Sequence, residues 1–263
     1  MKIAISGKGG VGKTTLAAVL ARLFGRDGRD VLLVDADPAP NTASALGIPR
    51  EQAEAITPLC SMSDLIEERT GVRPGSGYGA MFRLNPQVED IAGKFGMRGK
   101  DGVHLLVVGT IKSAGQGCFC PESALLKALL KHLVVRGDQV VILDMEAGLE
   151  HLGRGTAQGV ELLIVVVEPG LRSAGVARQI QALSMEMGVK RIGVVLNKIR
   201  DEEQASVLRR ELEGLEILGQ IPRDEGLVDA DLKGISPLDH PGAARAVGTI
   251  KELKEHIQKL GFA

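Results

Sequence analysis

The chain has 263 residues, a formal net charge of −1 and an aromatic content of 2%, and these values exclude several classes of protein. A net charge so close to zero creates no long-range field that would attract nucleic acid or an anionic membrane. Few aromatic side chains are available to stack on bases or to anchor at a membrane interface. No apolar run is long enough to cross a bilayer, and three cysteines do not make a disulfide framework. We therefore expect a cytoplasmic protein, without a signal peptide and with no nucleic-acid or membrane partner.

The first predicted elements are a strand at residues 3–5, a glycine-rich loop and a helix over about residues 14–24. A glycine loop in this context is typical of a phosphate-binding loop, because its backbone N–H groups curl around phosphate oxygens at the start of a helix. The lysine of such a loop reaches the β- and γ-phosphates of ATP, and the hydroxyl that follows it binds Mg²⁺. The predicted nucleotide-binding residues here are Gly9, Gly10, Val11, Gly12, Lys13, Thr14 and Thr15.

Acidic residues follow two other apolar runs. The run at residues 31–34 leads to Asp35 and Asp37, and the run at residues 140–143 leads to Asp144. Continuous apolar runs of this length are typical of strands buried in a parallel sheet. Carboxylates at the carboxyl ends of such strands can hold Mg²⁺, directly or through water, or act on the attacking water. Asp35 is equally consistent with capping local backbone N–H groups.

Two cysteines lie two residues apart in the segment Gly115-Gln-Gly-Cys118-Phe-Cys120-Pro-Glu. In an extended segment they fall on one side and can chelate one soft metal ion, such as Zn²⁺ or Ni²⁺. On spacing alone, two incidental loop cysteines are the alternative. Cys120 is the predicted N-cap of a helix that opens with Pro121, where the helix dipole favours a thiolate. A closed tetrahedral site needs four ligands, so a symmetric dimer would supply the other two. The third thiol, Cys60, is expected to be a small buried hydrophobe.

The second half of the chain continues the pattern. Residues 162–167 and 192–196 are predicted buried strands, and Asn197 follows the second, where its amide could contact an adenine edge. The last helix, about residues 243–260, has an apolar stripe that we attribute to core packing rather than to membrane binding. Residues 48–102 are the least informative stretch, and their role is left open.

Strands that alternate with helices predict an α/β fold with a mainly parallel central sheet flanked by helices. The nucleotide is expected at the carboxyl ends of the strands. We expect residues 1–263 to form a single P-loop ATPase domain.

Lys8 makes the glycine loop more specific. The form Lys8-Gly-Gly-Val-Gly-Lys13-Thr-Thr resembles the loop of the deviant Walker A ATPases, which belong to the SIMIBI class of P-loop NTPases. That group includes the nitrogenase iron protein and the chromosome-partitioning and division-site ATPases. The resemblance implies that Lys8 crosses a dimer interface to touch the partner's nucleotide. It also implies that Asp37, in the position of the switch I aspartate, positions the attacking water, so Lys8, Lys13 and Asp37 are the predicted catalytic residues.

Further segments narrow the resemblance. Together with the loop, Gln116-Gly-Cys-Phe-Cys-Pro121 and Asp144-Met-Glu-Ala-Gly-Leu-Glu-His-Leu-Gly-Arg-Gly155 look like the CooC-type nickel-insertion accessory ATPases of carbon monoxide dehydrogenase. The resemblance covers most of the chain and is weak between residues 48 and 102. It implies that Gly148, in switch II, offers a backbone N–H to the γ-phosphate. It also implies that Asn197, Pro222 and Arg223 contact the adenine side of the nucleotide.

The resemblance implies a MgATP-dependent homodimer that binds and delivers nickel for assembly of the carbon monoxide dehydrogenase cluster. Its expected partners are a second copy of the chain and the apo-enzyme. Two ATP sites would face each other, with the four thiolates of both Cys118–Cys120 pairs on the same axis. The sequence leaves open whether the metal is cargo or structural, and whether Zn²⁺ or Ni²⁺ is bound.

Three alternatives remain open at this point. The maturation ATPase of acetyl-CoA synthase is a near relative and would serve a different client apo-enzyme. A redox ATPase like the nitrogenase iron protein would hold a bridging iron–sulfur cluster, but that family uses a cysteine inside switch II, and this switch II has none. A partitioning-type ATPase would need a basic DNA-binding face or a membrane helix, and the sequence shows neither.

Overall fold

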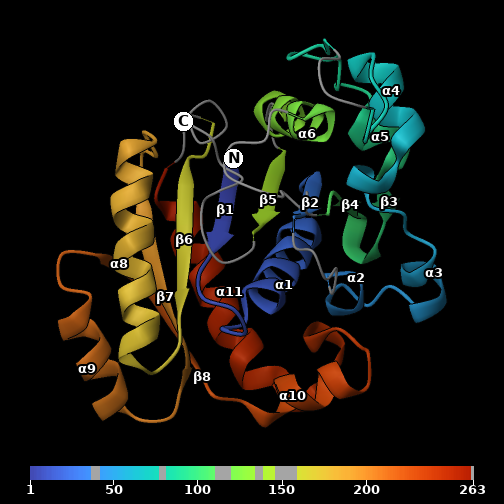
Figure 1. Ribbon diagram of the computed structural model, residues 1–263. Helices are drawn as coiled ribbons and strands as arrows, with labels where there is room; N and C mark the ends of the chain where they lie inside the picture. The colour runs from blue at the N-terminus through green and yellow to red at the C-terminus, as the bar shows by residue number, and fades with distance from the viewer. Residues whose placement is uncertain (37–41, 77–80, 110–119, 134–138, 146–158, 262–263) are drawn as a thin grey trace.

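The computed structural model describes residues 1–36, 42–76, 81–109, 120–133, 139–145 and 159–261. Among them, eight strands form one sheet in the order β3-β4-β2-β5-β1-β6-β7-β8 (Figure 1). All neighbouring strands are parallel except β3 and β4, which are antiparallel. The strand bounds are β1 Lys2–Ser6, β2 Val31–Asp35, β3 Met97–Arg98, β4 Val103–Val107, β5 Val140–Asp144, β6 Leu162–Val167, β7 Ile192–Ile199 and β8 Glu216–Pro222.

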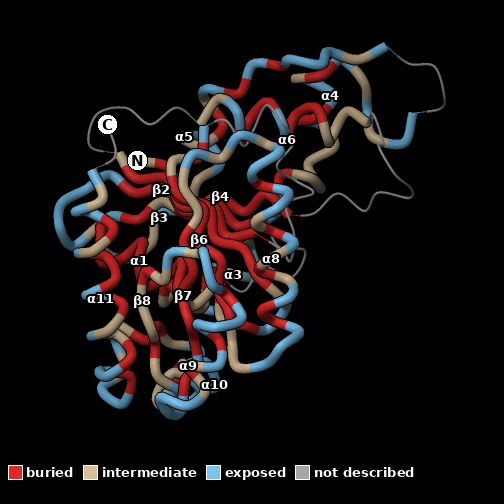
Figure 2. Tube along the Cα trace, turned by 90° about the vertical axis from the view of Figure 1, so that its left-hand side faces the viewer, coloured by how far each residue is buried: buried red, intermediate tan, exposed pale blue. Residues whose placement is uncertain are grey.

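The predicted mainly parallel α/β sheet is confirmed. Its central strands are continuous apolar runs because both of their faces are covered. Alternate residues of β1 belong to different cores: Ala4 packs with residues of helices α6 and α8, whereas Ile3 and Ile5 pack with residues of helices α1 and α11. The buried sheet lies at the centre of the molecule, with exposed residues mainly on the outer elements (Figure 2).

Helices connect the strands. Their bounds are α1 Lys13–Arg26, α2 Thr42–Ala45, α3 Arg50–Glu54, α4 Ser63–Thr70, α5 Ile91–Phe95, α6 Pro121–His132, α8 Leu171–Glu186, α9 Glu202–Glu211, α10 Glu225–Leu232 and α11 Ala244–Lys259. Short 3₁₀ turns add η1 Leu59–Ser61, η2 Lys100–Gly102, η3 Pro237–Asp239 and η4 Pro241–Ala243. None of the described helices is long and apolar enough to cross a membrane.

Several sequence expectations are refined by these bounds. The first helix continues past Gly25 to Arg26, and the left-handed residue that follows it is Gly28, with φ 79°. Gly25 is needed for a different reason, because a Cβ there would lie 2.2 Å from the backbone oxygen of Asp101. Cys60, expected to be buried, is partly exposed in η1. The last helix packs as expected, because its apolar residues Ala246, Ile250, Leu253 and Ile257 are at most 2% exposed.

Residues 48–102, uninformative as sequence, contribute several elements. They contain α3, α4, α5 and the two-residue antiparallel strand β3 at the edge of the sheet. α4 packs against α6. Pro222, expected on the adenine side of the nucleotide, is the last residue of the parallel strand β8, and Arg223 follows it. The structure does not test whether residues 1–263 are one domain, so that statement stays a prediction.

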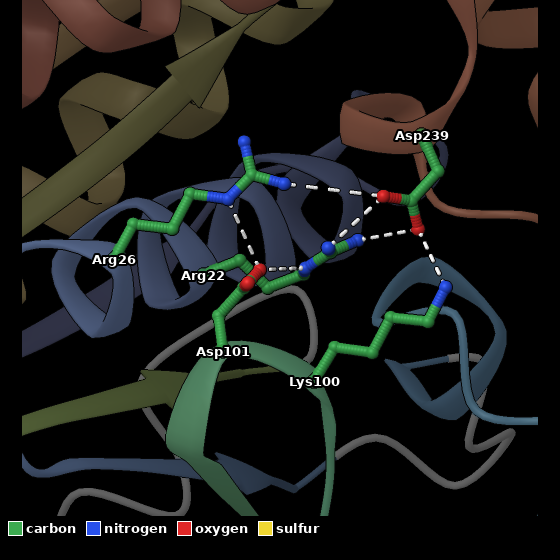
Figure 3. A network of polar contacts seen from close by, with 5 residues as sticks. All are labelled: Arg22, Arg26, Lys100, Asp101 and Asp239. Carbon is green, nitrogen blue, oxygen red and sulfur yellow. Dashed lines mark hydrogen bonds and ion pairs between the residues drawn. The ribbon is translucent and has the colours of Figure 1, made fainter.

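A buried guanidinium ties α1 to two distant turns. Arg22 is 2% exposed; its Nε lies 2.7 Å from Asp101 Oδ2 in η2, and its Nη1 lies 2.8 Å from Asp239 Oδ2 in η3 (Figure 3). Arg26 and Lys100 join the same two carboxylates. Burial disfavours the guanidinium charge, but hydrogen bonds with Asp239 and Asp101 raise the pKa of Arg22. The C-terminal half of the helix that follows the phosphate loop is thereby attached to η2 and η3.

Lys2, at the opposite face of the sheet, has a different environment. Its side chain is 2% exposed, and its Nζ donates a 2.5 Å hydrogen bond to the backbone oxygen of Leu130 in the last turn of α6. A cation at a helix C-terminus satisfies a carbonyl that has no partner within the helix. Burial nevertheless lowers the pKa of Lys2 to about 8. β1 is thus attached to α6 at the amino edge of the sheet.

Candidate nucleotide-binding site

The phosphate loop joins β1 to α1 at the carboxyl edge of the sheet. Gly7 has φ 145°, and a Cβ at this residue would lie 2.4 Å from the backbone oxygen of Val166 in β6. Gly12 is the N-cap of α1 with φ 94°, a conformation that favours glycine. Gly10 is also left-handed, with φ 77°. The loop therefore turns tightly onto the start of α1, whose first N–H groups face the position expected for phosphate.

Lys13, the predicted phosphate-binding lysine, is the first residue of α1. Its side chain is 7% exposed, and its Nζ lies 3.3 Å from the backbone oxygen of Lys8. The ammonium group is therefore folded back over the loop that it belongs to. Thr14 and Thr15 follow in the first turn of the helix, where their sequence positions place them for the metal ion and for phosphate.

Lys8 pairs with a residue that sequence analysis missed. Its Nζ lies 3.4 Å from Glu168 Oε1, and the Nζ of Lys198 lies 2.9 Å from the other carboxylate oxygen, Glu168 Oε2. Glu168 directly follows β6, and its own N–H is bonded to the hydroxyl of Ser173 in α8 at 3.1 Å. Burial disfavours the charged carboxylate, but Lys198 and then Lys8 lower the pKa of Glu168 below its ordinary value.

Asn197 and Lys198 attach the end of β7 to the phosphate loop. The Asn197 side-chain NH₂ donates to the backbone oxygen of Val11 at 2.7 Å, and its Oδ1 accepts from the N–H of Lys198 at 2.9 Å. Lys198 has a left-handed φ of 59°, and its Nζ donates to the backbone oxygen of Gly10 at 2.6 Å. Both ends of the Asn197 amide therefore serve the backbone, which favours a structural role beside the predicted adenine contact.

A cavity of about 720 Å³ continues from the loop along β7 and β8. Its lining includes Gly10, Gly12 and Thr15 of the loop, together with Asn197, Pro222 and Arg223. The three residues predicted on the adenine side are thus brought to one cavity with the phosphate loop. The volume lies within the range of ligand pockets, which is about 300–1,000 Å³. The Arg223 guanidinium is paired with Glu225 at 2.9 Å, so its backbone is the part more available to a base.

Two carboxylates meet where β2 and β5 end. Asp35 and Asp144 are direct neighbours in the parallel ladder, and they are 0% and 1% exposed. The Thr42 hydroxyl donates to Asp144 Oδ2 at 3.4 Å. Two adjacent buried carboxylates repel one another, so a divalent cation that prefers oxygen ligands fits this edge. Asp144, with Thr14 a predicted ligand of Mg²⁺, thus has Asp35 as its direct neighbour in the ladder.

Cys120, one of the two predicted thiol ligands, caps the N-terminus of α6 as the sequence predicted. Its backbone is extended, with φ −121°, and Pro121 is the first residue of the helix. Cys118, Asp37 and Gly148 lie outside the described residues. Within the described ranges, no three histidine, cysteine or acidic side chains come together as a metal site. The shared thiolate site therefore remains a prediction.

Comparison with protein families decides what kind of site this is. The model of the CobQ/CobB/MinD/ParA nucleotide-binding domain matches residues 2–238, which include the loop and all of the cavity lining except Ile250. The chain belongs to this family. It is a P-loop ATPase of the MinD type, as its loop predicted.

Two similar proteins cover nearly the whole of this P-loop ATPase. An uncharacterized ATP-binding protein of Methanocaldococcus jannaschii is 44% identical over 263 residues, which is 99% of this chain and 98% of the relative. The carbon monoxide dehydrogenase accessory protein CooC of Rhodospirillum rubrum is 42% identical over 245 residues, 93% of this chain and 92% of the relative. The CooC-type resemblance is confirmed at this level.

Solved structures agree on the fold. The MinC:MinD cell division protein complex of Aquifex aeolicus contains a chain with a TM-score of 0.70 and 22% identity, which covers 100% of this P-loop ATPase and 97% of that chain. A ParA family ATPase of Chlorobium tepidum has a TM-score of 0.71 and 19% identity, with coverage of 97% and 98%. At these identities the likeness shows the architecture alone.

Proposed function

We propose that this chain is a MgATP-dependent homodimeric maturation factor that binds and delivers nickel for assembly of the carbon monoxide dehydrogenase active-site cluster. The observation that carries the proposal is the 42% identity, over 93% of the chain, to a protein named as a carbon monoxide dehydrogenase accessory protein. The extra loop lysine and the thiol at the start of α6 support it, because they supply one group for nucleotide and one for a soft metal.

The described residues suit ATP hydrolysis. Lys13 would pair with the β- and γ-phosphate oxygens once they take the place of the Lys8 carbonyl, 3.3 Å from its Nζ. Thr14 and Asp144 would hold Mg²⁺, and Asp35 lies beside Asp144 in the ladder. Mg²⁺, when bound, supplies positive charge that stabilises the transferred phosphoryl group. Asp37 would orient the attacking water, and the N–H of Gly148 would contact the γ-phosphate.

The dimer part of the proposal depends on Lys8. Its side chain is 44% exposed and contacts Glu168, whereas the Lys13 ammonium contacts the Lys8 backbone oxygen. An exposed ammonium on a phosphate loop can reach the nucleotide of a second copy when two loops face each other. Each copy would then supply Lys8 to its partner's ATP, which makes hydrolysis dependent on dimer formation.

A mixing experiment tests this part. Lys8→Ala should retain much of its nucleotide affinity but lose ATPase activity and ATP-dependent dimerisation. Asp37→Asn should bind ATP and hydrolyse it slowly, because the water loses its positioning carboxylate. A mixture of the two variants should recover partial ATPase activity. In each heterodimer, one site combines Asp37 of the Lys8→Ala chain with Lys8 of the Asp37→Asn chain and is therefore intact. Parental activity of Lys8→Ala alone, without complementation in the mixture, would show that Lys8 does not act across an interface.

The metal part of the proposal treats nickel as cargo. Cys118 and Cys120 offer two thiolates per chain, and two chains offer the four that a closed soft-metal site needs. Zn²⁺ would take tetrahedral geometry, whereas Ni²⁺ can flatten toward square-planar. Because α6 starts at Cys120 and packs on the same sheet as the nucleotide strands, closure of the dimer around ATP would change the metal affinity.

Metal titration of apo and ATP-loaded protein, followed by analytical ultracentrifugation, tests this part. We expect one Zn²⁺ or Ni²⁺ per dimer, and an ATP-dependent change in affinity of roughly 5–150-fold, the usual range for coupled sites. Cys118→Ser and Cys120→Ser should each eliminate metal-dependent dimerisation with little change in ATP binding. Cys60→Ser is the matched control, because Cys60 lies in η1 and not in the paired motif. Two metal ions per dimer would contradict a bridged site.

The client and the alternatives are separated by two further measurements. Nickel-loaded protein with MgATP should activate the apo-form of carbon monoxide dehydrogenase, and the same assay with apo-acetyl-CoA synthase tests the alternative client. Anaerobically purified protein should be colourless. A brown sample containing iron and sulfide would favour an iron-protein-like redox ATPase instead.

A further inference from the structure

Lys198 lies at the centre of contacts that the proposed function does not use. Its ammonium group is 2.6 Å from the backbone oxygen of Gly10 and 2.9 Å from Glu168 Oε2. The same carboxylate is the partner of Lys8, at 3.4 Å on its other oxygen. One carboxylate therefore serves two lysines, and one of these lysines also holds the phosphate loop.

The backbone at Lys198 is built for this position. Lys198 has φ 59°, which is uncommon for a residue with a side chain. The ladder between β7 and β8 is irregular here, because Leu196 pairs with Gln220 and Ile199 pairs with Pro222. Such an irregularity redirects a side chain from its normal position in the strand. The N–H of Lys198 is held by Asn197 Oδ1 at 2.9 Å, which fixes the turn from its other side.

We propose that Lys198 is a positioning residue that holds the phosphate loop through Gly10 and neutralises Glu168 when Lys8 leaves for the partner's nucleotide. The second part rests on the proposed trans role of Lys8, whereas the first part does not. If Lys8 were the sole cation beside Glu168, its departure would leave a partly buried carboxylate unpaired. An unpaired buried charge is unfavourable, so Lys8 would be held back. Lys198 removes this penalty, since its 2.9 Å contact with Glu168 does not involve the oxygen nearest Lys8.

The two contacts of Lys198 have separate kinetic consequences. Loss of the Gly10 contact loosens the loop before nucleotide binds, so it should raise the KM for ATP. Without the Lys198 contact, Glu168 is paired with Lys8 alone. Lys8 should then move to the partner's nucleotide less readily, and kcat should fall. A variant that removes the ammonium should show both effects, and a second change at Glu168 should reverse the second effect alone.

The experiment is a double-mutant cycle measured by steady-state ATPase kinetics on the full chain. Lys198→Met should raise the KM for ATP and lower kcat, each by about tenfold, the effect of removing one charge-assisted hydrogen bond. Lys198→Met combined with Glu168→Gln should regain most of kcat but keep the raised KM. Lys190→Met is the matched control, because Lys190 is an exposed lysine just before the amino end of β7. It should behave like the parent.

Two variants keep the proposal testable if Lys198→Met fails to fold. Lys198→Arg keeps the positive charge beside Glu168 and should retain most of kcat. Glu168→Gln alone should dimerise with ATP at a lower protein concentration than the parent, as measured by ultracentrifugation, because Lys8 no longer has to leave a carboxylate.

The results that overturn the proposal are distinct from those that overturn the proposed function. An equal loss of kcat from Lys198→Met in the parent and in the Glu168→Gln chain would show that Glu168 is not the intermediary. An unchanged KM would show that the Gly10 contact does not position the loop. Parental ATPase activity in Lys8→Ala would instead remove the trans role of Lys8, and the KM effect of Lys198→Met would still test the loop contact.

Discussion

The two ends of β1 hold ammonium groups in opposite ways. At its carboxyl end, Lys13 and Lys198 lie over loop carbonyls, at 3.3 Å and 2.6 Å, beside a cavity that admits a charged ligand. At its amino end, Lys2 is 2% exposed and bonded to the Leu130 carbonyl. The Lys13 ammonium can exchange its carbonyl for phosphate, whereas Lys198 holds the loop through Gly10. Lys2 has no such exchange, and burial lowers its pKa to about 8. Lysine side chains thus serve two purposes: Lys13 serves ligand binding at one end of β1, and Lys2 attaches α6 at the other.

Removal of Lys13 should produce the largest effect at the carboxyl end. Lys13→Ala deletes the cation that faces the β- and γ-phosphates, so we expect loss of measurable MgATP binding by isothermal titration calorimetry. The fold should survive, because the Lys13 ammonium is bonded to its own loop and not to a distant element. Lys251→Ala, at an exposed position of α11, is the control. Parental affinity in Lys13→Ala would mean that phosphate binds elsewhere.

The amino end should instead give a pH-dependent stability. The pKa of Lys2 is about 8 in the folded chain, whereas an unfolded lysine titrates near 10.4. Between these values the unfolded state binds more protons, so the free energy of unfolding should rise with pH from about 8 to 10.4. The full contribution is roughly 3 kcal/mol, at 1.36 kcal/mol per pKa unit. Urea unfolding at several pH values measures it, and Lys2→Met should remove this part of the slope.

Arg22 sharpens the comparison, because it is a buried cation that is paired with carboxylates, Asp239 and Asp101, whereas Lys2 is bonded to a backbone carbonyl. Arg22 lowers the pKa of Asp239 to about 2. The stabilisation is therefore present above the unfolded pKa near 3.9 and is lost as the pH falls toward 2. After allowance for solvent screening we expect about 1–2 kcal/mol. Asp239→Asn should flatten the acid side of the urea-unfolding profile relative to the parent. Identical profiles would mean that Arg22 relies on Asp101.

The sequence predicted the phosphate loop because its function is local. The strand, the glycines, the lysine and the threonines follow one another directly in the sequence. Their spacing along the chain therefore determines most of the geometry of the loop. The ends of β2 and β5 were also predictable, since apolar runs place Asp35 and Asp144 at one edge. Their direct pairing depends on ladder register, which no short motif contains. In the same way, Cys120 was predicted as a helix cap because Pro121 follows it.

The long-range polar contacts were not predictable. Glu168 meets Lys8 and Lys198 across separations of 160 and 30 residues, and nothing in an isolated glutamate after an apolar run indicates those partners. Asn197 was interpreted from its side-chain chemistry as a base contact, which stays a prediction, and the fold adds a hydrogen bond from its amide to the Val11 backbone oxygen. The available signal for a role of Lys198 was its position directly after Asn197, near the carboxyl end of a strand. Its left-handed backbone, however, follows from an irregular ladder that sequence patterns do not reveal.

The position of β1 in the sheet has a consequence for synthesis of the chain on the ribosome. β1 pairs with β5 and β6, which begin at Val140 and Leu162, so β1 has no sheet partner until those residues emerge. At about 5–20 residues per second, that wait is roughly 7–30 seconds. During it, β1 has no neighbouring strand to pair with, although β2 and β4 can already pair with each other. The phosphate loop is thus translated well before the strands that complete its site, and a nascent chain should bind ATP only after β7 and β8, which line the cavity, have been translated.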